Sequence, residues 1–222
     1  MYNWDKQEPT CFWYVIKDEF GGVEELPPKV RNQVKKSLKT YDYRKVSREE
    51  MMKLGYELYN DSRKRFNNKD LYLTENEWWA RISGANKHLW LGIDKVSGRP
   101  ASFAINTMID DYVDYTSMGI GPDFPNNTYP MYGLIYEMNR YYLEDRKLKF
   151  VMDGARSITE HSNIQPFLEE KFKFRKAYCD LQIYYRTWVG IAVKVMFPFR
   201  EWIRSQSLSA LLNLEAMARG IY

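Results

Sequence analysis

Three strand-like segments follow one another closely in the middle of the chain. They cover residues 89–93, 101–108 and 112–118, and each is rich in apolar, β-branched and aromatic side chains. The stretches that separate them, residues 96–100 and 109–111, are polar and have the length of hairpin loops. Neighbouring strands joined in this way pair antiparallel, so an all-helical fold is excluded.

Helix signals precede this meander. Ser47 with Glu50, and Thr74 with Glu77, match the capping-box pattern that starts a helix. The first of these helices is expected to run to about residue 67, and the second carries two consecutive tryptophans.

The longest helical pattern comes after the meander. Over residues 131–148 the apolar positions recur three and four residues apart. A short apolar strand at 149–152 follows, then a helix introduced by Ser162 and Gln165. Clean alternation over residues 177–185 predicts a last strand.

The resulting order predicts an α/β (α+β) fold with a mixed, mostly antiparallel sheet flanked by helices. Residues 41–186 would form this domain. Residues 1–40 would be an N-terminal extension, with a strand at 11–16 and a basic amphipathic helix, and residues 187–222 a C-terminal helical segment.

Between residues 41 and 185 this order resembles the GNAT acyltransferase fold. The resemblance implies two central parallel strands that splay apart where an acyl donor inserts. In this chain they would be the strands at 112–118 and 149–152.

The loop after the first of these strands reads GIGPDFPNNTYPMYG. A typical GNAT member has Gln/Arg-x-x-Gly-x-Gly/Ala there, and backbone N–H groups at the following helix start hold a pyrophosphate. This chain lacks the basic first residue, and three prolines each remove a donor. The sequence therefore predicts a departure from ordinary acetyl-CoA binding, with Tyr129 and Tyr132 flanking the cleft as candidate binding residues.

Two further stretches resemble the FemAB-like branch, whose members carry a GNAT-type domain that transfers acyl or aminoacyl groups. LPPKVRNQVKKSLK, residues 26–39, is similar to its Leu-x-x-x-x-Arg-x-x-x-(Lys/Arg)-Lys-x-x-Lys helix. Residues 153–185 are similar to three successive motifs of this branch. They are Asp-(Phe)-Gly-(Arg)-Ser, then Phe-Lys-x-x-(Phe/Trp)-Gly-Phe, then Leu-x-Tyr. Here the first piece reads MDGARS, and the second, FLEEKFKFRKAY, lacks the glycine and the lysine directly after Phe167.

The segment after residue 152 offers groups suited to acyl transfer. Asp153 would serve as a base or an orienting carboxylate, Gly154 would allow a close backbone approach, and Arg156 would hold a phosphate or carboxylate. His161 could move a proton near neutral pH. Ser157 is a further candidate binding residue.

Structural roles compete with each of these. Asp153 and Arg156 could pair with each other or cap nearby backbone, and Ser157 with Glu160 could be only a capping box. His161 precedes a helix, where a solvated loop histidine is common.

Tyr115 is a candidate proton donor to the leaving group. On a regular strand it shares a face with Val113 and Ser117, and Asn106 on the preceding strand would be its neighbour and a candidate binding residue. Packing in the core is the alternative role for this phenol.

The basic helix supplies another candidate surface. Arg31, Lys35 and Lys39 recur every fourth residue, which suits either phosphate contacts, as with a tRNA, or a solvated face.

Composition narrows the class of protein and its expected compartment. A hydrophobic content of 45% supports a packed core, and a formal net charge of +4 is mildly basic. Cys11 and Cys179 form no CxxC pair and no His-rich tract accompanies them, so neither a disulfide framework nor a metal site is expected. The N-terminus lacks the layout of a signal peptide, and no apolar run reaches a membrane span. A reducing cytoplasm fits these features.

We therefore expect a FemAB-like transferase that moves an acyl or aminoacyl group, from acyl-CoA or aminoacyl-tRNA, to an amine or hydroxyl of a small metabolite or cell-envelope precursor. A plain acetyl-CoA-dependent N-acetyltransferase is one alternative, and a non-catalytic binding or assembly module is another. The apolar C-terminal helices would suit a homodimer or a membrane-surface contact.

Overall fold

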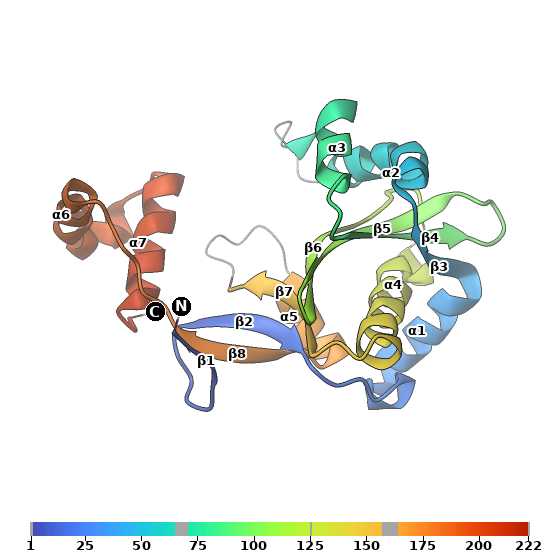
Figure 1. Cartoon of the computed structure of the whole chain (residues 1–222), viewed down its shortest axis with the longest axis horizontal. Helices are drawn as coiled ribbons and strands as arrows, with labels where there is room; N and C mark the ends of the chain where they lie inside the picture. The colour runs from blue at the N-terminus through green and yellow to red at the C-terminus, as the bar shows by residue number, and fades with distance from the viewer. Residues whose placement is uncertain (1, 65–70, 125, 157–163, 222) are drawn as a thin grey trace. The chain divides into compact units, whose positions relative to one another are not determined.

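The computed structural model describes residues 2–64, 71–124, 126–156 and 164–221. It consists of two compact units, which are coloured along the chain in Figure 1. The larger unit holds Lys17–Asp153 and Glu170–Lys173. The smaller unit holds Met1–Ile16, Gly154–Glu169 and Phe174–Tyr222.

The sheet of the larger unit follows the order β7-β6-β5-β4-β3. Its strands are β3 (Tyr41–Val46), β4 (Lys87–Asp94), β5 (Pro100–Ile109), β6 (Tyr112–Ile120) and β7 (Phe150–Ala155). The first four pair antiparallel in sequence order, and β7 pairs with β6 in parallel. The predicted meander and the mixed, mostly antiparallel sheet are therefore confirmed.

Helices cover both faces of this sheet. They are η1 (Val23–Glu25), α1 (Pro28–Thr40), α2 (Arg48–Arg63), α3 (Glu75–Ile82), η4 (Asn126–Thr128), α4 (Pro130–Asn139) and the π-helical η5 (Arg140–Asp145). Figure 1 shows α2 and α3 on one face, and α1 and α4 on the other. Both predicted helix starts are confirmed, since Ser47 Oγ accepts the Glu50 N–H at 3.2 Å and Thr74 forms a full capping box with Glu77.

The predicted helix at 131–148 is shorter and less regular than expected. Its α-helical part ends at Asn139, and a π-helical turn continues to Asp145. Within this turn two consecutive residues, Tyr142 and Leu143, are both buried. A π-helical turn holds more residues than an α-helical turn, so its side chains depart from the α-helical spacing. The apolar pattern of the sequence alone does not reveal such a turn.

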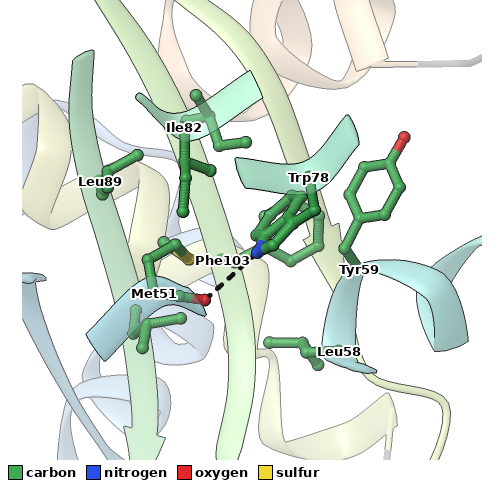
Figure 2. Packing of buried hydrophobic residues seen from close by; sticks show 9 residues of the cluster. Met51, Leu58, Tyr59, Trp78, Ile82, Leu89 and Phe103 are labelled. Carbon is green, nitrogen blue, oxygen red and sulfur yellow. Dashed lines mark hydrogen bonds between the residues drawn. The ribbon is translucent and has the colours of Figure 1, made fainter. Parts of the chain in front are cut away.

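The core between the sheet and helices α2 and α3 is aromatic. Figure 2 shows Trp78 of α3 packed beside Tyr59 of α2 and Phe103 of β5. The Trp78 ring lies 5.0 Å from the Tyr59 ring and 6.2 Å from the Phe103 ring, measured between centroids. Its indole N–H donates to the Met51 carbonyl at 3.4 Å, so the buried polar atom has a partner.

The smaller unit contains a three-stranded antiparallel arrangement in the order β1-β8-β2. The strands are β1 (Tyr2–Lys6), β2 (Phe12–Lys17) and β8 (Arg175–Asp180). The helices α5 (Ile164–Phe172), α6 (Thr187–Met196), η6 (Phe197–Trp202) and α7 (Gln206–Ala218) complete the described elements. The predicted strand at 177–185 begins earlier, at Arg175, and ends at Asp180, which pairs with Tyr2 of β1.

Strand β1 was not predicted, and its sequence YNWDK explains why. Asn3 and Asp5 have φ values of 51° and 57°, so the strand is irregular where the residues are polar. Both residue types tolerate the left-handed region, but they carry no strand signal.

Replacement of Trp78 by alanine should destabilise the larger unit by about 3–5 kcal/mol, because a fully buried indole is lost and a cavity remains. Trp79→Ala is the matched control, since Trp79 is 42% exposed on the same helix and should cost less than about 1 kcal/mol. Urea denaturation followed by circular dichroism measures both. Equal effects of the two substitutions would contradict this description of the core.

Candidate functional site

Strands β6 and β7 are parallel neighbours that separate soon after they meet. Tyr112 lies opposite Phe150, Val113 opposite Val151 and Asp114 opposite Met152. No later pair joins them in the described part of the chain, although β6 continues to Ile120. The ladder of the two strands thus ends at Asp114 and Met152, and we call the place where this pairing stops the wedge.

An irregularity in β6 accompanies this separation. Thr107 of β5 faces Asp114, and Ile105 faces Ser117. Two residues of β6, Tyr115 and Thr116, thus occupy the place opposite Asn106. Such a bulge bends the strand and redirects its side chains, and bulges are common next to active sites.

Gly154 in β7 is a second irregularity. It has a φ of 74°, a region that residues with a Cβ rarely adopt, and the space where a Cβ would stand is open. The conformation is one that glycine adopts readily, and the close backbone approach expected at Gly154 stays a prediction. Strand β7 runs to Ala155, however, so Asp153 and Gly154 lie within the strand and not after its end as predicted.

The bulge assigns β6 side chains to different faces of the sheet. The Tyr115 hydroxyl donates to Asn139 Oδ1 on α4 at 2.8 Å, whereas Ser117 Oγ accepts from Arg63 on α2 at 3.1 Å. The prediction that Tyr115 and Ser117 share a face is therefore wrong. The extra residue shifts the alternation by one step.

Tyr115 is buried, with 3% of its surface exposed. Burial raises the pKa of Tyr115 well above its ordinary value, and Tyr142 and the Asp153 carboxylate raise it further. The phenol therefore keeps its proton. Its hydrogen bond to Asn139 makes it part of the core beside the wedge.

Asn106 joins a different buried network, centred on the Tyr142 hydroxyl. The Tyr142 oxygen accepts hydrogen bonds from Asn106 Nδ2 at 3.1 Å and from Trp90 Nε1 at 2.9 Å. His88 Nδ1 lies 3.2 Å from the same oxygen. Asn106 Oδ1 is buried and has no hydrogen-bond partner. Asn106 lies opposite the bulge at Tyr115 and Thr116, but its side chain bonds to Tyr142. The Tyr142 and Tyr115 rings lie 6.2 Å apart, measured between centroids.

The other face of the sheet carries a row of polar side chains across β4, β5 and β6. Lys87 Nζ donates to Thr107 Oγ1 at 2.7 Å, and Thr107 Oγ1 lies 2.6 Å from Thr116 Oγ1. Thr116 Oγ1 lies 3.4 Å from Asp114 Oδ2. The row leads from a lysine to a carboxyl group at the point where the wedge opens.

Asp114 is a further candidate residue, which the sequence did not single out. Partial burial raises the pKa of Asp114, against the opposite effects of its hydrogen bond to Thr116 and the charge of Lys87. A carboxyl with a raised pKa is better suited to accept a proton near neutral pH than an ordinary one. The available signal was a charged residue inside the strand-like YVDYTSMGI.

A scan against protein-family models gives no match for the chain, and neither does a search of curated protein sequences. Solved structures do match. FemX shares 13% sequence identity, with a TM-score of 0.57 over 78% of this chain and 60% of FemX. The chain folds like FemX.

Two further structures agree with this FemX-like fold. An L-PGS from Bacillus licheniformis has 11% identity and a TM-score of 0.55 over 95% of this chain and 66% of its own. The C-terminal domain of a putative lysylphosphatidylglycerol synthetase from Agrobacterium fabrum has 13% identity and a TM-score of 0.50 over 66% of this chain and 46% of its own. The predicted GNAT-like, FemAB-like fold is confirmed, and the chain spans only part of the length of these proteins.

Within this FemX-like fold, the start of α4 is occupied by side chains of the protein itself. Ser37 Oγ donates to the Tyr129 carbonyl at 2.7 Å and accepts the Gly133 N–H at 3.3 Å. Tyr43 donates to the Pro130 carbonyl at 2.8 Å. This helix start therefore differs from the open row of amides with which a helix N-terminus holds a pyrophosphate.

The two predicted tyrosines of this region lie together. Tyr129 has a left-handed φ of 57°, and its ring lies 5.5 Å from that of Tyr132. Lys36 Nζ is 5.9 Å from the Tyr129 ring, and the Tyr132 ring is 5.8 Å from Phe172.

The predicted basic residues of α1 have unlike surroundings. Arg31 forms an ion pair with Glu24 and donates to the Leu26 carbonyl at 3.3 Å, so it fastens the segment before the helix. Lys35 and Lys39 are exposed on the helix.

Arg156 belongs to the smaller unit. Its Nη1 donates to the Cys11 carbonyl at 2.7 Å, and its guanidinium lies 4.2 Å from the centre of the Trp13 ring. Ser157 and His161, the remaining predicted site residues, lie outside the described residues.

Metal ligands do not gather in the part of the chain that the structure describes, where no group of three or more His, Cys, Asp or Glu could hold an ion. Cys179 is buried and Cys11 is partly buried.

The half-buried His88 provides a test of the Tyr142 network. Burial, with the charges of Lys45 and Arg146, lowers the pKa of His88 from 6.5 to about 4. The unfolded chain then binds a proton before the folded one does, so stability should fall as the pH drops from about 6.5 to about 4. For a half-buried ring we expect His88 to account for about 1–2 kcal/mol of this loss.

Urea denaturation across this pH range measures the effect, with His88→Gln as the control because glutamine keeps a polar side chain and does not titrate. The variant should lose less stability than the parent over the same interval. Parallel pH profiles for the two proteins would show that His88 is not held neutral by its surroundings.

Proposed function

We propose that the wedge between β6 and β7 is the active site of a transferase that moves an acyl or aminoacyl group to an amine or hydroxyl. The observation that carries the proposal is the end of the β6–β7 ladder at Asp114 and Met152. Where two neighbouring strands part, an amide-containing donor can insert between them and form backbone hydrogen bonds. The FemX-like fold supports this reading.

Asp114 would accept the proton of the incoming nucleophile. The nucleophile attacks the acyl carbonyl carbon, a new N–acyl or O–acyl bond forms, and the bond to the donor's sulfur or ribose oxygen breaks. The proton passes to the Asp114 carboxylate, and the leaving group gains a proton in its turn. The raised pKa of Asp114 favours the first transfer, and Thr116 donates a hydrogen bond to the carboxyl at 3.4 Å.

Asp153 would act on the opposite face of the wedge. Met152 is the strand partner of Asp114, so in a regular strand the next residue, Asp153, would point to the opposite face, the one on which Tyr115 bonds to Asn139. There it is suited to orient a cationic amine, while Tyr115 and Asn139 keep the wall of the wedge rigid.

The acceptor we propose is a precursor of the cell envelope. The support comes from the fold shared with a protein described as a putative lysylphosphatidylglycerol synthetase, a name that denotes an aminoacylated lipid headgroup. A small metabolite with an amine would meet the same chemistry.

For the donor we propose aminoacyl-tRNA ahead of acyl-CoA. The first turn of α4 already gives the Gly133 N–H to Ser37, and Pro130 has none, which leaves a poor grip for a pyrophosphate. Lys35, Lys36 and Lys39 on α1 offer exposed positive charge for a phosphate backbone. The same engagement of the helix start argues against a plain acetyl-CoA enzyme.

Asp114→Asn tests the chemistry. Loss of the proton acceptor should lower the transfer rate by about 10²–10⁴-fold, while the fold persists because partial burial disfavours the charge that is removed. As the pH falls, the parent should lose activity at a pH above the ordinary pKa of an aspartate, because the pKa of Asp114 is raised. The variant should lack this pH dependence. Single-turnover transfer with aminoacyl-tRNA or acyl-CoA measures both.

The control is Asp110→Asn, on the hairpin before β6. Asp110 is exposed and has a φ of 48°, which asparagine also tolerates, so its activity should match the parent. Equal rates for the parent and both variants would rule out Asp114 as the base. Absence of turnover with every donor, together with undiminished donor binding, would favour the non-catalytic module.

The salt dependence of donor binding tests the choice of donor. If tRNA is bound through α1, log affinity should fall steeply with log salt, and Lys35→Gln and Lys39→Gln should each reduce the slope by about 1. Lys53→Gln, an exposed lysine of α2, is the control and should leave it unchanged. A flat response in the parent would instead support acyl-CoA.

A further inference from the structure

The surface of α6 and η6 is strongly apolar on its outer side. Its exposed members are Trp188 (69% exposed), Ile191, Val195, Phe199 and Trp202 (78% exposed). In sequence the first four are spaced by three and four residues, which places them along one side of a helix. The Phe199 and Trp202 rings contact each other with centroids 6.0 Å apart.

The core of the smaller unit does not need these side chains. It is built from the other side of the same elements, where Val193 and Phe197 are buried against Leu212 and Ala216 of α7. An exposed apolar face of this size, next to a complete core, is typical of a binding surface.

The charges around this face are nearly all positive. Arg186, Lys194, Arg200 and Arg204 accompany it, and Glu201 is the one acidic residue between Gln182 and Leu214. This segment therefore contributes +3 of the formal net charge of +4. A complementary partner must offer apolar surface and negative charge together.

We propose that this face binds an anionic lipid bilayer, with α6 and η6 lying in the plane of the headgroups. Tryptophan and phenylalanine side chains suit the boundary between headgroups and acyl chains, and flanking lysine and arginine side chains reach anionic headgroups. Across the described residues, no helix has the length and apolar character needed to cross a bilayer, so the segment would lie on the membrane surface. The inference goes beyond the transfer reaction and does not depend on it.

Vesicle flotation of the full chain tests the proposal, with phosphatidylcholine vesicles and with mixed phosphatidylcholine–phosphatidylglycerol vesicles as the probes. The parent should bind the anionic vesicles, more weakly as salt rises. Trp188→Ser/Trp202→Ser should weaken this binding by about tenfold or more, because both indoles leave the interface. Trp79→Ser, at an exposed tryptophan of the larger unit, is the matched control and should bind like the parent.

A second variant, Lys194→Gln/Arg204→Gln, keeps the aromatic residues and should lose the preference for anionic vesicles. If the tryptophan variant does not fold, this second variant tests lipid binding on its own. The proposal fails if the parent floats with neither vesicle, or if both variants bind as it does. It also fails if light scattering shows a parent dimer that Trp188→Ser/Trp202→Ser converts to a monomer, since a second copy then covers the face. None of these readouts involves transfer, so they leave the proposed reaction untouched.

Discussion

Hydrogen bonding between β6 and β7 ends after three residue pairs, and the site depends on this interruption. Backbone N–H and C=O groups in a sheet normally find partners on both sides, so a ladder that stops early requires a local cause. The chain has two irregularities at this place, the bulge at Tyr115 and Thr116 in β6 and the positive φ of Gly154 in β7. Both irregularities lie within two residues of the last pair of the ladder.

The bulge also divides the chemistry between the two faces of the sheet. Tyr115 is directed to Asn139 on α4 and remains a buried, protonated phenol, whereas Asp114 and Thr116 join the polar row on the opposite face. A carboxyl group that is only partly desolvated can exchange protons, but a fully buried phenol bonded to an amide serves mainly to hold its strand in place. The division explains why Asp114 is a better candidate for proton transfer than Tyr115.

The two units contribute different kinds of surface. The larger one contains the wedge and an aromatic core around Trp78, which fixes α2 and α3 on the sheet. The smaller one has a core around Val193 and Phe197 and leaves Trp188 and Trp202 exposed in a segment that carries four basic residues. The proposed reaction site and the proposed lipid-binding surface thus rest on separate sets of residues, which can be changed independently.

The sequence by itself determined the elements whose signals are local. Hairpin-length separators predicted the meander, capping boxes at Ser47 and Thr74 predicted where two helices begin, and the order of elements predicted the GNAT-like fold and its two splayed strands. Only the tertiary structure decided which residues stand at the wedge. The bulge opposite Asn106, the π-helical turn that buries Tyr142 and the desolvation of Asp114 arise from contacts between elements distant in the chain. A one-residue shift in register leaves composition and periodicity almost unchanged, yet it moves every later side chain of the strand to the other face.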